Sequence, residues 1–432
     1  MGIVPSSMKT FKISQIIDRH IFLGASYSEF PVKAKMSEFI ILALFIFCLP
    51  SLEAPKNILY VSYILIWIFN RVKYQKITIS WGAWDTLFGI WLLSGFFIAA
   101  ISNQGINEWN GAFDLVRYIS IGWLVYRANY SPQTLTLLLS LVVASTLIGA
   151  FYSFYLLDGS HFNLYSVGHI NHGAIYYSIS TGVVLSLATI FWSKFNFFQR
   201  AILATIVLAF FYFTFQTQSR GAILPLLFIF CPLFFLSISF MYKKILVYFF
   251  LSILVLVGVS ISLDLPIVSK IEKIYQDGSI NFSSRERSIN SGLLIWKNYP
   301  IAGVGLENID RFMTKDSLKS IAENFGLTFS EQKYYVGSHA HNIYANTLGE
   351  RGILGFIPLI VILVFWLYLM VKERPSVEKT MHEIAAWGAA LSAWTAVSIG
   401  GLFNTTLHHE HGSLAVLLLG IWLASKRLTT KH

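Results

Sequence analysis

The sequence predicts an all-α protein, a polytopic bundle of transmembrane helices with one long, partly helical loop outside the membrane. Of the 432 residues, 55% are hydrophobic and only 12% are charged, whereas an ordinary soluble domain has about 25% charged residues. Apolar runs of about 20 residues, long enough to cross a bilayer as a helix, recur along the chain. They lack the polar stripe of a soluble helix and the alternation of a membrane-barrel strand, which excludes both classes.

About twelve spans are predicted, each a continuous apolar run bounded by polar or charged residues. In chain order they cover residues 36–53, 57–70, 85–102, 112–126, 133–157, 171–192, 201–218, 221–240, 245–263, 352–371, 383–403 and 413–425. The long loop, residues 264–351, lies between the ninth and tenth predicted spans, and a helix is predicted within it at 288–298. A loop of this length in a compact protein is usually functional.

The basic residues predict how the bundle is oriented. Lysine and arginine fall in alternate loops, which the positive-inside rule assigns to the cytoplasm. These residues are Arg71, Lys73, Lys76, Arg127, Lys194, Arg200, Lys243, Lys244, Lys372, Arg374, Lys379, Lys426 and Arg427. Both termini are therefore expected in the cytoplasm. Residues 1–35, with the basic amphipathic stretch 9–23, are expected at the cytoplasmic membrane surface, and residues 1–432 are expected to form a single integral membrane domain.

Three side chains on the predicted outer side suggest chemistry. Arg220 is held between two apolar runs, Arg285 lies early in the long loop, and His341 lies near its end, at the mouth of a membrane helix. Ionisable groups in such places are functional candidates. Guanidinium groups grip phosphate oxygens, and a neutral histidine can take a proton from a hydroxyl. Arg220 could instead form a structural pair, and Arg285 could be a solvated loop charge.

The order and spacing of these elements resemble the bacterial O-antigen ligase and polymerase superfamily. Residues 219–221 read Ser-Arg-Gly between two spans, and Arg285 precedes Pro300-Ile-Ala-Gly-Val-Gly305 at the family's spacing. His341-Asn-Ile-Tyr344 follows, and then Glu350-Arg-Gly-Ile-Leu-Gly355. The resemblance covers roughly residues 216–359 and the number of spans. It implies a glycan transferase in the bacterial inner membrane, with residues 264–351 and the active site in the periplasm.

The resemblance implies an O-antigen ligase, which transfers polysaccharide from undecaprenyl diphosphate to a hydroxyl of lipid A–core, with inversion and without a metal. Arg220 and Arg285 would bind the donor diphosphate and His341 would act as base, although His339 stays open as the proton acceptor. A polymerase usually has two large loops, and position 296 here is tryptophan rather than the glycine of its Arg-x(10)-Gly element. A protein O-oligosaccharyltransferase usually has a soluble region near its C-terminus, which is not expected here because the chain ends soon after the last span. A transporter would show repeat symmetry, which is not evident.

Other polar residues receive supporting or structural roles. Asn342 and Tyr344 are expected to support His341, with Asn342 orienting the histidine or the acceptor. Glu350 is expected to pair with Arg351 or to hold the long loop against the bundle. His408, His409, Glu410 and His411 have the composition of metal ligands, but adjacent residues of a short loop rarely point at one ion, so their role stays open. His161, His169 and His172 are interpreted as polar lining of an acceptor cleft or as solvated interfacial residues, and Arg117 as an ion pair with Asp114 or a helix-end charge. No cofactor, metal or nucleic acid is expected.

Overall fold

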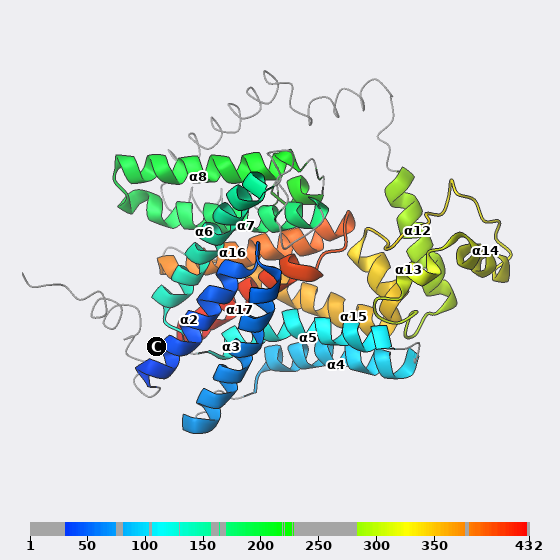
Figure 1. The fold of residues 1–432 in the computed structure, drawn as a ribbon, viewed down its shortest axis with the longest axis horizontal. Coiled ribbons are helices and arrows are strands. Elements are labelled where there is room, and N and C mark those ends of the chain that lie inside the picture. Colours follow the sequence, from blue (N-terminus) through cyan, green and yellow to red (C-terminus); the bar gives the residue numbers. More distant parts are fainter. Residues whose placement is uncertain are drawn as a thin grey trace, which may run out of the picture.

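The structure, a computed structural model, is built from helices packed side by side (Figure 1). It describes residues 31–74, 81–102, 106–128, 130–156, 164, 170–217, 219, 221–226, 228, 283–375 and 380–429, and none of these forms a strand. The helices are α2 (Val32–Cys48), α3 (Glu53–Tyr74), α4 (Ala83–Ser102), α5 (Ile106–Arg127), α6 (Pro132–Leu156), α7 (Ile170–Phe191), η3 (Trp192–Lys194), α8 (Phe197–Gln216), α12 (Ser283–Asn298), α13 (Ile309–Phe312), α14 (Lys315–Asn324), α15 (Ile343–Lys372), α16 (Met381–Ser398), η4 (Gly400–Leu402) and α17 (His409–Thr429).

The all-helical prediction is confirmed over the described residues, and six helices there are long and apolar enough to cross a membrane. They cover Ala83–Ser102, Pro132–Leu156, Asn171–Phe191, Phe197–Gln216, Ile343–Lys372 and Met381–Leu402. Helices α2, α3, α5 and α17 lie at four further predicted spans. Most of the span predicted at 221–240, all of that at 245–263, and residues 264–282 of the predicted loop lie outside the described residues, so the total of about twelve stays a prediction.

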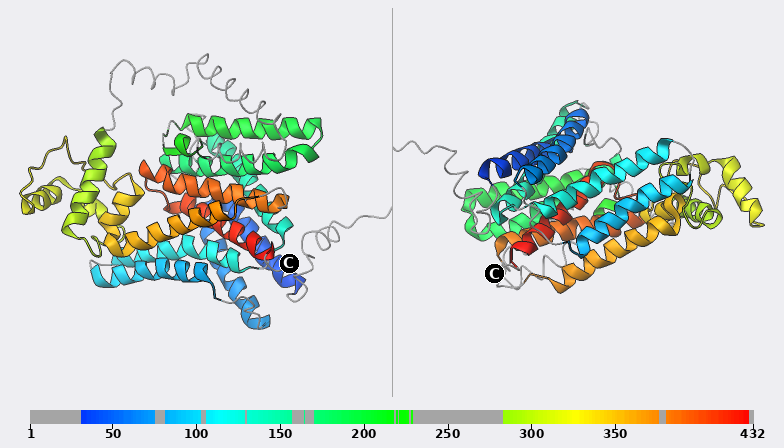
Figure 2. Two further views of the ribbon diagram at one scale, coloured as in Figure 1. Left: turned by 180° about the vertical axis from the view of Figure 1, so that it is seen from behind. Right: turned by 90° about the horizontal axis from the view of Figure 1, so that it is seen from below.

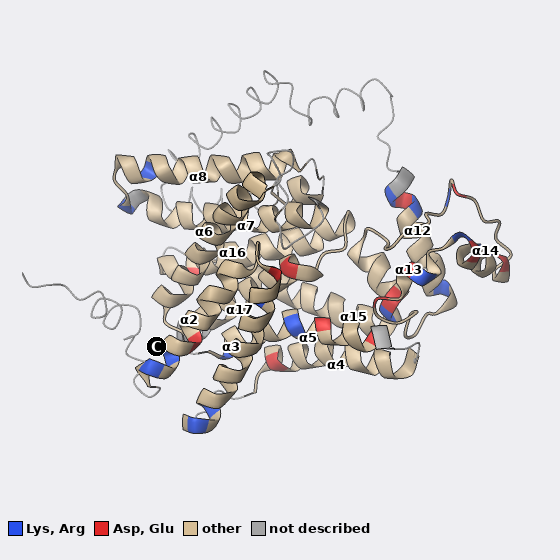
Figure 3. Ribbon diagram, in the orientation of Figure 1, with Lys and Arg blue, Asp and Glu red and all other residues tan. Residues whose placement is uncertain are grey.

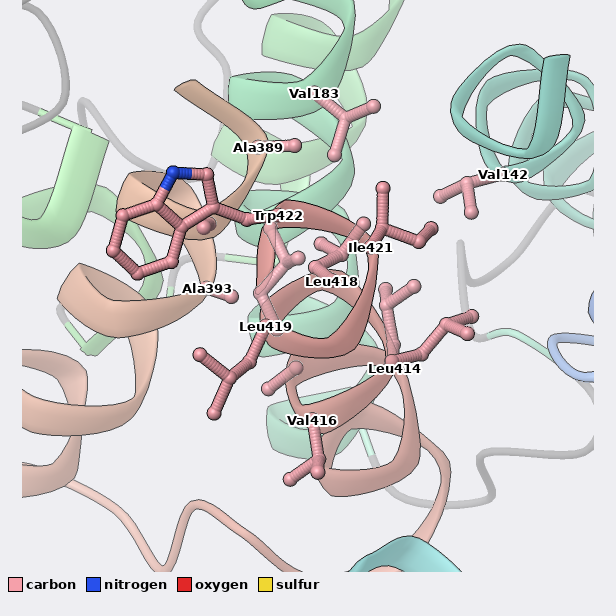
Figure 4. Packing of buried hydrophobic residues seen from close by; sticks show 14 of the residues in the cluster. Val142, Val183, Ala389, Ala393, Leu414, Val416, Leu418, Leu419, Ile421 and Trp422 are labelled. Carbon is pink, nitrogen blue, oxygen red and sulfur yellow. The ribbon is translucent and has the colours of Figure 1, made fainter. Parts of the chain in front are cut away.

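Helix α17 forms the centre of the bundle. It packs against α5, α16 and α7, and its side chains point outward in all directions toward these neighbours (Figure 4). A helix that is apolar all round is stable only when it is surrounded. Glycine permits the closest contact, because a Cβ atom on Gly420 would lie 2.3 Å from the carbonyl oxygen of Gly122 in α5.

Buried ion pairs join helices within the bundle. The guanidinium of Arg71 in α3 lies 2.6 Å from Glu38 in α2, and that of Arg127 in α5 lies 2.6 Å from Asp85 in α4. Removing one partner of such a pair leaves a buried charge uncompensated, which costs about 3–5 kcal/mol. These pairs therefore hold α3 beside α2 and α5 beside α4.

The two ends of the bundle differ in character. Basic residues lie at the start of α2, at the end of α3 and around the start of α8, whereas the remote segment that contains α12, α13 and α14 carries basic and acidic residues together (Figure 3). Two further views show the same segment projecting from one end of the bundle (Figure 2). The described helix ends next to the loops that the sequence assigns to the cytoplasm, at the start of α2, the end of α3 and the start of α8, thus lie remote from residues 283–342.

The projecting segment has a small core of its own. Its buried apolar residues are Leu294, Ile295, Val304, Ile309, Met313, Leu318, Ile321, Ala322 and Tyr334. Helix α12 starts at Ser283, five residues before the predicted start, and packs against α14 and α15. The predicted loop is therefore a folded unit docked on the bundle over its described residues.

Helix α15 differs from the prediction at its start. It begins at Ile343, within the predicted loop, and breaks at Gly352, where the spanning helix was predicted to start (φ 54°, ψ −157°). Residues 300–305 satisfy the backbone groups exposed by the break. The amides of Val304 and Gly305 donate to the carbonyls of Gly349 and Glu350, at 2.9 and 2.8 Å. The amides of residues 353 and 354 donate to the carbonyls of residues 300 and 301, at 3.0 and 3.1 Å.

This docking predicts that Gly303→Ala strongly destabilises the fold. Gly303 has φ +68°, and a Cβ atom there would lie 2.3 Å from the carbonyl carbon of Glu350. Gly326→Ala is a matched control, since Gly326 has φ +66° but open space around the added atom. The control should lose only about 1–2 kcal/mol of its free energy of unfolding, the conformational cost of a left-handed alanine. Thermal unfolding of the purified variants measures the difference, and equal melting temperatures would contradict the prediction.

Candidate functional site

His341 has an unusual backbone that its neighbours hold in place. Its φ is +49°, in the left-handed region that costs most L-residues about 1–2 kcal/mol. The side-chain oxygen of Asn342 caps α15 by accepting from the amides of Tyr344 and Ala345, both at 2.9 Å. The Asn346 side chain accepts from the amide of Ala340 at 3.1 Å. Two asparagines thus bracket His341, and strain of this kind is concentrated at functional sites.

The imidazole of His341 lies among other rings. The ring of His339 meets it edge to face, with centroids 4.0 Å apart, and Tyr335 lies at 6.1 Å. The hydroxyl of Ser338 lies 2.8 Å from Nδ1 of His339. His341 is half-buried, so its ring is both fixed by packing and open to a substrate.

Helix α12, which carries Arg285 in its first turn, contacts the chain beside His341 at Gly292, about two turns beyond Arg285. At Gly292 the helix lies so close to the chain around His341 that an added Cβ atom would be 3.0 Å from Cβ of Ala340 and 3.1 Å from the carbonyl oxygen of Ala345. Ser291 bonds both backbone groups of Tyr335, at 2.8 and 2.9 Å. Arg285 is half-buried in the first turn of α12, and seven residues separate it from Gly292. Since seven residues make about two turns, both lie on one face of the helix.

Arg220 lies outside the described residues, but Ser219 and Gly221 are described. A Cβ atom on Gly221 would lie 3.3 Å from Cβ of Phe403 and 3.4 Å from the carbonyl oxygen of Gly400, beside η4. The segment of η4 also contacts the His341 region, because the side-chain amide of Asn342 donates to the carbonyl of Leu402 at 3.0 Å. Residues 400–403 therefore contact both Gly221 and Asn342.

The remaining predicted residues have structural contacts. The hydroxyl of Tyr344 donates to the carbonyl of Ser398 at 2.9 Å, which ties α15 to α16. Asn342 uses its amide on the backbone, so it orients the segment of His341. The backbone carbonyl of Glu350 accepts from the amide of Gly305, a contact that does not depend on its side chain, so the expected role of that side chain stays a prediction. Its carboxylate faces Asn346 and Arg351.

Histidines gather beside the site, at the start of α17. The ring of His172 in α7 lies 4.8 Å from that of His409 and 5.3 Å from that of His411, and His408 lies 3.8 Å from His409. Burial, with His409 nearby, lowers the pKa of His408 to about 3, so this imidazole is neutral at pH 7. Within the part of the chain that the structure describes, no three histidine, cysteine or carboxylate side chains are arranged to hold a metal ion. His161 and His169 lie outside the described residues.

A small, partly open cleft of about 50 Å³, lined by polar and apolar side chains, lies beside these elements. Its lining includes carboxylates that the sequence did not single out as a group, Asp114 of α5 and Glu307, together with Glu350. The predicted pair of Arg117 with Asp114 is confirmed at 3.3 Å. Burial and the carboxylate of Asp114 raise the pKa of Glu307 to about 7. No short motif could reveal this pairing, because the two residues meet only through the fold.

The comparisons with known proteins bear on the same segment. A family model described as O-antigen ligase matches residues 204–360, which include Arg220, α12, His341 and Glu350. No curated protein matches the chain significantly. The predicted resemblance is thereby confirmed for that segment. Residues 204–360 are thus similar to the O-antigen ligase family, which is consistent with the O-antigen ligase and polymerase superfamily.

Proposed function

We propose that the protein is an O-antigen ligase, which transfers polysaccharide from undecaprenyl diphosphate to a sugar hydroxyl of lipid A–core. The observation that carries the proposal is a left-handed His341, held between two asparagines, within the segment that matches the ligase family. A base must meet its substrate in one geometry, and a backbone locked on both sides provides that. The donor and lipid A–core are the expected partners.

The proposed reaction is a single displacement with inversion at the donor's anomeric carbon. The acceptor oxygen forms the new bond to this carbon, and its proton passes to the imidazole of His341. The bond from the anomeric carbon to the diphosphate oxygen breaks, and undecaprenyl diphosphate leaves with the electron pair. Arg285 and Arg220 neutralise the negative charge that develops on it, which is the role best suited to preorganised guanidinium groups.

The proposed setting is the bacterial inner membrane, with both termini in the cytoplasm and the site facing the periplasm. The support is the separation of the bundle's basic end from residues 283–342 (Figure 3). Cysteines introduced at Ser338 and Ser376 should then react with a membrane-impermeant reagent from opposite sides. Reaction of both from one side would refute this orientation.

Complementation of a ligase-deficient Gram-negative strain tests the function. Wild-type protein should restore long polysaccharide ladders on lipid A–core, seen on lipopolysaccharide gels, and deplete the carrier-linked polymer. Arg220→Ala, Arg285→Ala and His341→Asn should leave carrier-linked polymer to accumulate. Carrier-linked chains that stay one repeat long without this protein would instead identify a polymerase. Glycans found on periplasmic proteins would identify an oligosaccharyltransferase, and no change in any pool would favour transport.

A further inference from the structure

The small cleft beside α15 is built directly onto the segment that holds His341. One wall is a single helical face, because Ile343, Asn346, Thr347 and Glu350 follow the three- and four-residue spacing of a helix. This helix begins immediately after Asn342. A ligand in the cleft would therefore contact α15, the helix that begins two residues after His341, the proposed base.

The opposite walls come from three separate elements. Helix α5 contributes Asp114 and Tyr118, the loop after α12 contributes Glu307, and the loop before α17 contributes residues 405–408. Gly111 allows the close approach of α5, since an added Cβ atom would lie 2.7 Å from Cβ of Leu306 and 3.2 Å from Cγ of Glu307. The cleft is thus formed where the bundle and the projecting segment meet.

The lining is suited to neutral hydroxyl groups. Carboxylates are hydrogen-bond acceptors, whereas Asn346, Thr347 and a neutral His408 can supply donors. The lining contains three carboxylates, those of Asp114, Glu307 and Glu350, but only one guanidinium, that of Arg351. Asp114 is also paired with Arg117. Glu307, whose pKa is raised to about 7, is only partly ionised at neutral pH and can donate as well as accept. The lining therefore has no excess of positive charge to hold the donor diphosphate.

Two buried polar atoms of the lining retain hydrogen-bonding capacity. Nε of Arg351, a side chain only 6% exposed, and the hydroxyl of Thr405 have no hydrogen-bond partner among the described residues. The same guanidinium is anchored through another nitrogen, which donates to Ser94 at 2.8 Å. Buried polar groups in folded proteins are normally paired, so these atoms mark a place where a ligand or water is needed.

We infer that this cleft is the acceptor site, and that it binds an unphosphorylated sugar whose hydroxyl groups donate to Asp114 and Glu307. The inference rests on the proposed transfer function and specifies its acceptor. Because the cleft has room for only a few small groups, hydroxyl groups of the sugar would enter it along the face of α15 that starts at Ile343, while the ring lies at its opening. His341 does not line the cleft, and the reacting hydroxyl would be the one directed out of it toward His341. Asp114 and Glu307 act as binding residues at the mouth, and they take no part in proton transfer.

The test is a kinetic titration with the full-length protein, using O-antigen-free lipopolysaccharide as the acceptor probe and carrier-linked polymer as the donor. Asp114→Asn and Glu307→Gln should raise the acceptor KM by about ten- to a hundredfold, the effect of losing a hydrogen bond to a charged group. The donor KM and kcat should stay within about twofold of wild type. Asp316→Asn and Glu331→Gln, exposed carboxylates of the projecting segment, are the matched controls and should change neither constant.

Each other outcome overturns the inference. A raised donor KM would place the donor glycan in the cleft, and an unchanged acceptor KM in variants that melt like wild type would leave the cleft without a role in binding. If wild type fails to transfer to lipopolysaccharide but extends carrier-linked chains, the ligase proposal fails. The same variants are then titrated with single carrier-linked repeats, so that the cleft is judged independently of the ligase assignment.

Discussion

Replacing His341 by asparagine is expected to lower the rate of transfer by about 10²–10⁴, the usual contribution of a general base. Asparagine is the most informative substitution because it tolerates a left-handed backbone better than other residues that could replace histidine. The φ of +49° can therefore persist without added strain. The variant removes the imidazole and leaves intact the caps made by Asn342 and Asn346.

The measurement is single-turnover transfer from carrier-linked polymer to O-antigen-free lipopolysaccharide, together with thermal unfolding of the same preparation. His341→Ala provides the comparison, since it should lose as much activity but also melt at a lower temperature. Its extra destabilisation should be about 1–2 kcal/mol, the cost of a left-handed alanine. A well-folded His341→Asn enzyme that keeps more than about a tenth of the wild-type rate would exclude His341 as the base and turn attention to His339.

The sequence was sufficient to predict the described apolar helices, because lipid imposes a simple rule. A segment that crosses a bilayer must be apolar and must pair its backbone internally, so long apolar runs become helices whatever surrounds them. The start of the span predicted at residue 352 coincides with the backbone break at Gly352. Glycine and the change from polar to apolar composition both mark that point in the sequence.

The parts that sequence could not predict depend on contacts between distant segments. Residues 343–351 are polar enough to read as loop, yet they form a helix because Asn342 caps one end and residues 303–305 satisfy the other. Likewise Asp114 and Glu307 come together only because Gly111 lets α5 approach Leu306. A local pattern identifies His341 and Arg285 as candidates, but only the fold reveals what supports them and which cleft opens beside them.

Replacing Arg285 by alanine is expected to lower kcat by about 10²–10³, the usual effect of removing one group that stabilises developing charge. Arg285 lies in the first turn of α12, and hydrogen bonds join this helix to residues 331–335. Arg287 donates to the carbonyl of Glu331 at 2.7 Å, and Asn290 donates to that of Lys333 at 3.1 Å. This support should keep α12 folded when Arg285 is changed, so the loss should appear in activity and not in melting temperature.

Arg285→Lys distinguishes charge from geometry. Lysine keeps the positive charge but cannot grip two phosphate oxygens in the fixed fork of a guanidinium, so it should restore only part of the lost rate. Lys297→Ala, which removes a positive charge from the last turn of the same helix, is the matched control and should leave kcat unchanged. If the control and Arg285→Ala lose the same activity, Arg285 contributes only to the general charge of the projecting segment. If Arg285→Ala raises the donor KM at constant kcat, the guanidinium binds the donor equally in the ground and transition states, and neutralisation of the leaving group falls to other residues.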